Sequence, residues 1–180
     1  MIILELKTAQ STAIKVVIDA INSLLNDANF DFYPNIINSS QDKTQTGGII
    51  LKEINKTGKI LVYMKLDADK FDVYNYNYHK DKLTLGIDIN NLLKCLKCMS
   101  HYDTMSWIVD DDDINKLIII LESSERKEKK TFKLKYESLS LDFKNNLLQI
   151  EKNFSIKGAV QFHERIYNNI VINIFLIYIY

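Results

Sequence analysis

The sequence repeats one order of secondary structure twice, and this repeat limits the possible folds more than any other feature. Alternating β-branched residues in IILELKT (2–8) predict a strand. A helix follows, for which Ser11 or Thr12 is the expected N-cap. Its apolar stripe at the helical period consists of Ile14, Val17, Ile18, Ile21, Leu24 and Leu25. Three strand-like runs then follow: NFDFYP (29–34), GGIILKEI (47–54) and KILVYMKL (59–66), the first two separated by the polar loop SSQDKTQTGG.

The same order begins again near residue 70. FDVYNYNY (71–78) and LTLGIDI (83–89) predict strands, and NLLKCLKCM (91–99) predicts a helix capped by Asn90 or Asn91. Its buried side is expected to hold Leu92, Leu93 and Leu96. Three more strands are predicted at TMSWIV (104–109), KLIIILES (116–123) and KTFKLKYE (130–137), with Asp110 to Asp113 as a turn. We therefore expect an α+β fold: two β-α-βββ units, with both helices packed on one face of antiparallel sheet.

Charge and composition indicate a folded, soluble protein. Lys and Arg number 23 and Asp and Glu number 23, and 47% of the residues are hydrophobic. Zero net charge argues against a wholly basic coat for nucleic acid, but it leaves room for a locally basic face. Lys15, Lys94 and Lys97 lie on the polar sides of the two predicted helices. Spacing alone favours reading them as ordinary solvated helix faces.

The sequence contains two patterns that resemble metal sites, and neither is complete. Cys95 and Cys98 form C-x-x-C with His101 close behind, but structural zinc takes four ligands and no second Cys/His pair is present. The run Asp110 to Asp113 lacks the spacing and the glycine of a calcium loop. No phosphate-binding loop or nucleophile motif occurs. We expect no cofactor, no metal and no enzymatic activity.

Four segments resemble the N-terminal domain of the DNA sliding clamp family, proliferating cell nuclear antigen (PCNA). They are AINSLLNDANFDF (20–32), MKLDADKFDVYNY (64–76), GIDINNLLKCLKC (86–98) and TMSWIVDDDDINKLIIILES (104–123). The resemblance covers residues 1 to about 150 and is greatest to the divergent clamps of large DNA viruses or protists. It implies a processivity factor that forms a ring around duplex DNA and does not read the base sequence. A clamp loader is expected to place this ring on DNA, where it tethers DNA polymerase and other clamp-binding proteins.

The resemblance also assigns residues to surfaces. Lys15, Lys94 and Lys97 match lysines that face DNA in the family, while Asn22 and Val16 stand where many members carry further lysines. The expected DNA-binding set is therefore Lys15, Asn22, Lys94 and Lys97, on a face less basic than usual. The expected pocket for partner peptides is lined by Ile54, Leu61, Leu139 and Leu148. KLIIILES (116–123) is expected to pair edge-on with a neighbouring chain.

The resemblance divides the chain into three parts. Residues 1–137 are expected to form the N-terminal clamp domain, 138–153 a segment like the interdomain connector, and 154–180 an unrelated tail. The tail was interpreted as a buried strand, a membrane-surface anchor or, preferably, a read-through product. Because a second clamp domain is missing, we expect a truncated clamp. The alternatives are a ring of six half-clamps, in which 116–123 pairs with 71–78, and a half-clamp that acts only as a protein-interaction module. The expected location is the nucleus or a viral replication compartment.

Overall fold

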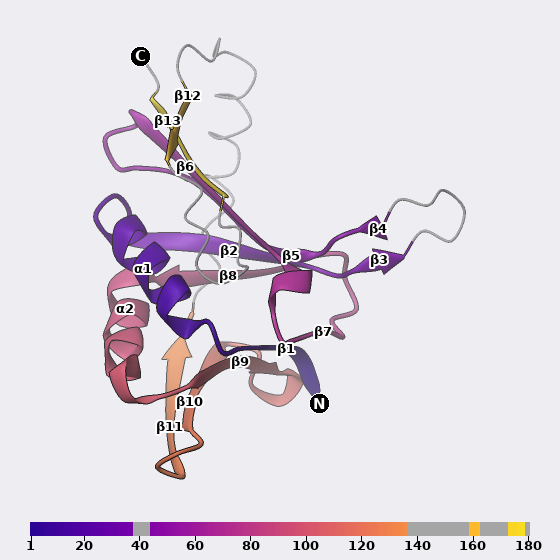
Figure 1. The fold of residues 1–180 in the computed structure, drawn as a ribbon. Coiled ribbons are helices and arrows are strands. Elements are labelled where there is room, and N and C mark those ends of the chain that lie inside the picture. The colour runs from indigo at the N-terminus through magenta and orange to yellow at the C-terminus, as the bar shows by residue number, and fades with distance from the viewer. Residues whose placement is uncertain (38–43, 137–158, 163–172, 179–180) are drawn as a thin grey trace.

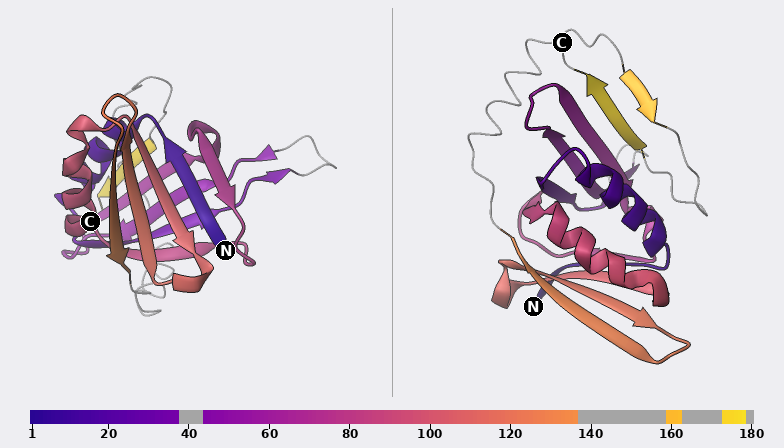
Figure 2. Two further views of the ribbon diagram at one scale, coloured as in Figure 1. Left: turned by 90° about the horizontal axis from the view of Figure 1, so that it is seen from below. Right: turned by 90° about the vertical axis from the view of Figure 1, so that its left-hand side faces the viewer.

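Within the described residues, two helices, two large antiparallel sheets and a separate two-stranded hairpin make up the fold. The computed structural model describes residues 1–37, 44–136, 159–162 and 173–178 (Figure 1). The helices α1 (Ser11–Asn22) and α2 (Ile89–Lys97) pack against each other. Figure 2 shows them side by side in its right-hand view, with one sheet above and the other below. The predicted α+β class is confirmed, but the strands divide between two sheets, a separation that the alternation of single strands does not reveal.

The order of the strands defines both sheets. The five-stranded sheet runs β11 (Glu128–Lys135), β10 (Lys116–Ser123), β9 (Thr104–Asp110), β1 (Ile2–Thr8) and β7 (Val73–Tyr76). The six-stranded sheet runs β12 (Ala159–Phe162), β13 (Asn173–Tyr178), β6 (Ile60–Asp67), β5 (Gly48–Ile54), β2 (Asp27–Tyr33) and β8 (Leu83–Asp88). Short 3-10 helices are η1 (Ala68–Lys70), η2 (Cys98–His101) and η3 (Asp111–Asp113).

Each repeated unit contributes the strand that precedes its helix to the sheet of the other unit. β1 pairs with β9, so that Leu4 lies opposite Val109, and β8 pairs with β2, so that Leu85 lies opposite Phe30. The two units therefore interlock and share one hydrophobic core. The repeat boundary near residue 70 separates two copies of a pattern, and neither copy has a complete sheet without strands from the other.

The helix stripes face this core as predicted. Five of the six stripe positions on α1 and the turn after it are buried, and Leu24 is partly buried against them. Leu92, Leu93 and Leu96 of α2 are buried as well. Burial of such amphipathic faces, at roughly 1.5–3 kcal/mol for each fully buried side chain, is what fixes the helices on the sheets.

The helix caps differ from the prediction. The residue at the N-cap of α1 is Gln10, which makes no side-chain capping bond, and Ser11 is buried inside the first turn. The N-cap of α2 is Asp88, whose Oδ1 accepts a hydrogen bond of 2.8 Å from the Asn91 amide. Both helices begin earlier than predicted, and β8 ends at the residue that caps α2.

The Gly pair of the predicted loop 39–48 lies where two segments of backbone meet. The loop contains β4 (Thr44–Gln45), which pairs with β3 (Ile36–Ile37) in a separate hairpin. Gly48 begins β5 with φ of 141°, and a Cβ there would lie 2.1 Å from the Leu66 carbonyl oxygen. Only glycine fits such a position without strain. The hairpin β3–β4 therefore projects from a point where the backbone at Gly48 is closely packed against that of Leu66 (Figure 1).

The expected assembly strand 116–123 is not a sheet edge. This segment is β10, which is hydrogen-bonded to β9 on one side and to β11 on the other. The edge is β11, where the inward positions hold Phe132 and Leu134 and the intervening residues are mostly lysine. Apolar strands such as β10 occupy sheet interiors, whereas lysine-rich strands are typical of edges. The pairing of 116–123 with 71–78 of another copy is therefore wrong.

Part of the C-terminal segment joins the fold. The sequence analysis set residues 154–180 apart as an unrelated tail. The structure pairs β13 with β6 from Asn173 opposite Lys65 to Tyr178 opposite Ile60, and β12 with β13. These strands extend the six-stranded sheet beyond β6. The predicted connector 138–153 lies outside the described residues.

Candidate nucleic-acid interface and docking face

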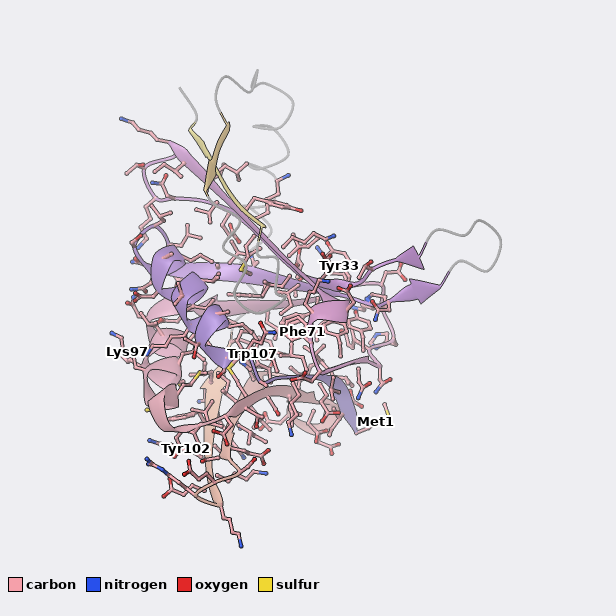
Figure 3. The ribbon with its side chains drawn as sticks, viewed as in Figure 1. Met1, Tyr33, Phe71, Lys97, Tyr102 and Trp107 are labelled. Atoms are coloured by element: carbon pink, nitrogen blue, oxygen red, sulfur yellow. The ribbon has the colours of Figure 1, made fainter. Side chains whose placement is uncertain are left out.

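Each of the two adjacent helices has an exposed polar side opposite its buried apolar stripe. Lys94 and Lys97 of α2 are exposed, and Lys15 of α1 is half-buried. Figure 3 shows Lys97 projecting outward from α2, away from both sheets. This placement follows from the spacing, because the buried leucines of α2 take the opposite side of the helix. Lys94 and Lys97 thus share the exposed side of α2, and Lys15 lies on the neighbouring helix α1.

Few carboxylates lie among these lysines. Asp19 is the exposed acid on α1, and no carboxylate of the described residues forms an ion pair with Lys15, Lys94 or Lys97. The Lys94 Nζ donates a hydrogen bond of 3.3 Å to Asn91 Oδ1. Lys94 and Lys97 lie in the last turn of α2, where cations interact favourably with the helix dipole. The face can therefore offer positive charge to an anion without first breaking a salt bridge.

Asn22 is placed differently from the lysines. Its side chain is half-buried, and its Oδ1 atom has no contact with solvent and no hydrogen-bond partner within the described structure. Val16 is 48% exposed on the same helix. Val16 is thus an apolar position within α1 and Asn22 has an inward-facing amide at the end of the helix, so the positive charge of the surface comes from its lysines.

The expected docking pocket maps to the outer face of the six-stranded sheet. Ile54 of β5 and Leu61 of β6 lie directly opposite each other in the register. Ile54 is buried and Leu61 half-buried. Leu139 and Leu148 lie outside the described residues. The structure thus brings together the two members of the expected pocket that it describes.

Strand alternation identifies neighbours on this face that the sequence analysis missed. Ile50 lies opposite Lys65, and Lys52 opposite Tyr63, in the same register as Ile54 and Leu61. Residues two apart on a strand share a face, so the period-2 pattern of 50, 52 and 54 was the signal available in the sequence. The face combines aliphatic and tyrosine side chains with two lysines, which suits an amphipathic peptide.

The structure also shows where the C-x-x-C cysteines and the acidic turn Asp110 to Asp113 lie. Cys95 is buried, and burial raises the pKa of its thiol. The Cys98 Sγ lies 3.8 Å from the Lys94 carbonyl oxygen. Across the described residues, no group of three or more His, Cys, Asp or Glu side chains is arranged to hold a metal ion. Asp110 binds the amine of Met1 at 2.8 Å, so the acidic turn is tied to the N-terminus.

No described helix combines the length and the apolar character needed to cross a bilayer.

Comparisons with known proteins agree with the geometry of the helices and sheets. Residues 3–145 match the family described as proliferating cell nuclear antigen, N-terminal domain. Over 148 residues the chain is 26% identical to the proliferating cell nuclear antigen of Dictyostelium discoideum, covering 82% of this chain and 50% of that relative. Over 157 residues it is 24% identical to the protein of the same name from Saccharomyces cerevisiae, covering 87% of this chain and 55% of the relative. The chain spans about half the length of these curated relatives.

Proposed function

Because the chain belongs to the family of the proliferating cell nuclear antigen N-terminal domain, we propose that it is a component of a DNA sliding clamp. In this role it holds duplex DNA loosely inside a ring and tethers DNA polymerase and other replication proteins to the template. The observation that supports this most directly is the pair of adjacent helices carrying Lys15, Lys94 and Lys97, none of which forms a salt bridge with a described residue. The role requires binding and no catalysis.

The chemistry of such a face suits sliding. Lysine side chains neutralise phosphates without contacting base edges, so they give affinity without sequence preference. Each neutralised phosphate adds about 0.9 to the slope of log affinity against log salt concentration. A face with only three lysines therefore holds DNA weakly, and topological closure of the ring, with the help of a clamp loader, has to supply the retention.

Partner proteins are proposed to dock on the opposite side of the domain. The outer face of the six-stranded sheet, around Ile54 and Leu61, is the proposed site for a short amphipathic peptide, to which the segment holding Leu139 and Leu148 would add. A ring needs further clamp domains, because one such domain closes only a part of it. The proposed place of action is the nucleus or a viral replication compartment.

The lysines can be tested by the salt dependence of DNA binding. In Lys94→Gln/Lys97→Gln, the slope of log affinity against log salt concentration should fall by about 1.8 relative to the unaltered chain. Lys56 and Lys59 are exposed in the turn between β5 and β6, so Lys56→Gln/Lys59→Gln removes the same charge elsewhere. Fluorescence anisotropy with a labelled 30-base-pair duplex measures both variants. Equal slopes for the two double variants would remove the helix face from the DNA-binding role.

Ring closure needs a separate measurement. The chain, together with a polymerase and a loader, should remain on nicked circular DNA longer than on linear DNA, because a ring slides off free ends. Equal loss from both templates, without any stimulation of DNA synthesis, would refute the clamp function.

The position of β13 favours a second candidate function. β13 pairs with β6, so this edge of the six-stranded sheet is not open to a strand of another clamp domain. The second candidate is therefore a half-clamp that binds clamp-binding peptides or a complete clamp without encircling DNA. Mass in solution separates the two functions. A monomer that binds peptide on the Ile54 face but gives no salt-dependent DNA binding favours the interaction module.

A further inference from the structure

The outer face of the five-stranded sheet carries a cluster of three isoleucines. On β9 and β10 the core side is taken by buried residues such as Trp107 and Ile119, so strand alternation places Ile108, Ile118 and Ile120 on the outer side. All three are half-buried. In the right-hand view of Figure 2 this sheet forms the lower surface of the molecule, and in the left-hand view, taken from below, it faces the viewer. The isoleucines therefore form an apolar surface on the outside of the sheet.

Opposite charges lie at the two ends of this apolar surface. Across the strands, Glu5 lies opposite Ile108, Ile108 opposite Ile118, and Ile118 opposite Lys133. One row of the sheet thus reads carboxylate, isoleucine, isoleucine, ammonium from β1 to β11. Neither Lys133 nor Glu5 forms an ion pair with a described residue. The Glu5 Oε2 accepts a hydrogen bond of 3.1 Å from the neutral Asn75 amide, so both charges remain available.

The charges that border the row on its other two sides are already paired. On one side Glu122 lies 3.6 Å from the Lys7 Nζ and 3.2 Å from the Lys129 Nζ. On the other side the Lys116 Nζ lies 2.6 Å from Asp113. An apolar centre inside a polar border is the usual anatomy of a protein interface.

The row is complementary to itself. Consider two such sheets stacked face to face and related by a two-fold axis that runs parallel to the strands, midway between β9 and β10. This axis places β11 of one protomer over β1 of its partner, and β10 over β9. Lys133 then meets Glu5, and Ile118 meets Ile108, and the symmetry repeats each contact. Aligned sheets stack in this way at a spacing of about 10 Å.

We propose that the outer face of the five-stranded sheet binds a second copy of this chain, stacked face to face. Burial of the isoleucines supplies the attraction, and the two Lys133–Glu5 ion pairs fix the register. The contact involves side chains of one sheet face and no backbone pairing at the edges β11 and β7. It uses neither the helices nor the outer face of the six-stranded sheet. A patch of this size gives a weak dimer.

Exchanging the charges tests the proposal on the full chain. Sedimentation equilibrium up to about 1 mM protein should show a monomer–dimer equilibrium that weakens with salt. Lys133→Glu and Glu5→Lys should each weaken it about tenfold, because each replaces two ion pairs by like charges. An equimolar mixture of the two variants should restore association, since each protomer then offers the charge that the other needs.

Two further variants separate this face from the rest of the surface. Ile118→Thr keeps a β-branched residue but removes apolar area, so it should also weaken the dimer while circular dichroism shows an unchanged fold. Lys56→Glu reverses a charge in the turn between β5 and β6 and should leave the dimer unchanged.

Three outcomes would overturn the proposal. The first is an unaltered chain that stays monomeric over the whole concentration range. The second is association that persists unchanged in Lys133→Glu and Glu5→Lys, which would assign it to another surface. The third is a mixture of these variants that associates no better than either alone. The Lys94→Gln/Lys97→Gln variant keeps this face intact, so failure of the clamp function leaves the dimer measurement readable.

Discussion

The ring of Phe30 meets the ring of Trp107 edge to face, with centroids 6.2 Å apart and an interplanar angle of 72°. Phe30 comes from β2 of the six-stranded sheet and Trp107 from β9 of the five-stranded sheet. Both side chains are almost completely buried, and the Trp107 Nε1 donates to the Met105 Sδ at 3.2 Å. This contact therefore joins the two sheets inside the shared core.

Shortening Trp107 should weaken the packing between the two sheets and lower the free energy of unfolding. We expect Trp107→Ala to lower the free energy of unfolding by about 3–5 kcal/mol, because it removes a large buried ring and leaves a cavity. A double-mutant cycle with Phe30→Leu and Trp107→Leu should give a coupling of about 0.5–1.5 kcal/mol for the ring pair. Trp107 is the single tryptophan, so urea unfolding has to be followed by circular dichroism. A loss below about 1 kcal/mol for Trp107→Ala would contradict this role.

The cap of α2 can be tested by replacing Asp88. Asp88→Ala should cost about 1 kcal/mol, because the Asn91 amide loses its acceptor, while Asp88→Asn should retain most of the stability. Asp19→Ala serves as a control, since Asp19 is exposed in the middle of α1. Urea midpoints of the three variants provide the comparison. If Asp88→Ala and Asp19→Ala behave alike, the cap contributes nothing measurable.

The amine of Met1 and the carboxylate of Asp110 should make stability depend on pH at both extremes. Their hydrogen bond raises the pKa of the amine above its ordinary 8.0 and lowers the pKa of Asp110 below its ordinary 3.8. The amine contribution is complete below about pH 8 and is lost as the pH rises through the raised pKa. The Asp110 contribution is present above about pH 4 and is lost as the pH falls through the lowered pKa.

Asp110→Asn should therefore flatten both ends of the pH profile. Melting temperatures measured from pH 2 to pH 11 should differ most between the two proteins on the plateau and converge at the extremes. Profiles of the same shape would show that the contact does not persist in solution.

Asn22 should behave as a structural residue and not as a DNA contact. Asn22→Leu is expected to stabilise the chain by about 1 kcal/mol, because it removes a buried oxygen that has no partner within the described structure. Affinity for duplex DNA should stay the same. A fall in affinity comparable to that of Lys94→Gln/Lys97→Gln would instead restore Asn22 to the DNA-binding set.

The sequence predicted most elements because their signals are local. The helical spacing of Leu92, Leu93 and Leu96 and the alternation in β5 and β6 depend on neighbours within one turn or one strand. Strand partners are not local, since Leu4 meets Val109 only through the tertiary fold. The edge position of β11 and the pairing of β13 with β6 were inaccessible for that reason.

The candidate site was predictable to the same extent. Spacing placed Lys94 and Lys97 opposite the buried leucines, and the structure has them exposed. Spacing did not show that Asn22 differs from the exposed lysines, because the burial of its Oδ1 atom depends on how the end of α1 packs in the tertiary fold. Asp88 was missed as the cap because it was counted within a strand, and a residue can end a strand and begin a helix at once.

The exchange of β1 and β8 between the units has a consequence for synthesis. β1 leaves the ribosome well before its partner, because the β9 residues that lie beside it, such as Val109, are translated about a hundred positions later. Until then the apolar strand β1 lacks its partner strand β9, and such an exposed segment is prone to non-native contacts or to binding by chaperones. The shared core of the two units therefore cannot be completed before β9 has been translated.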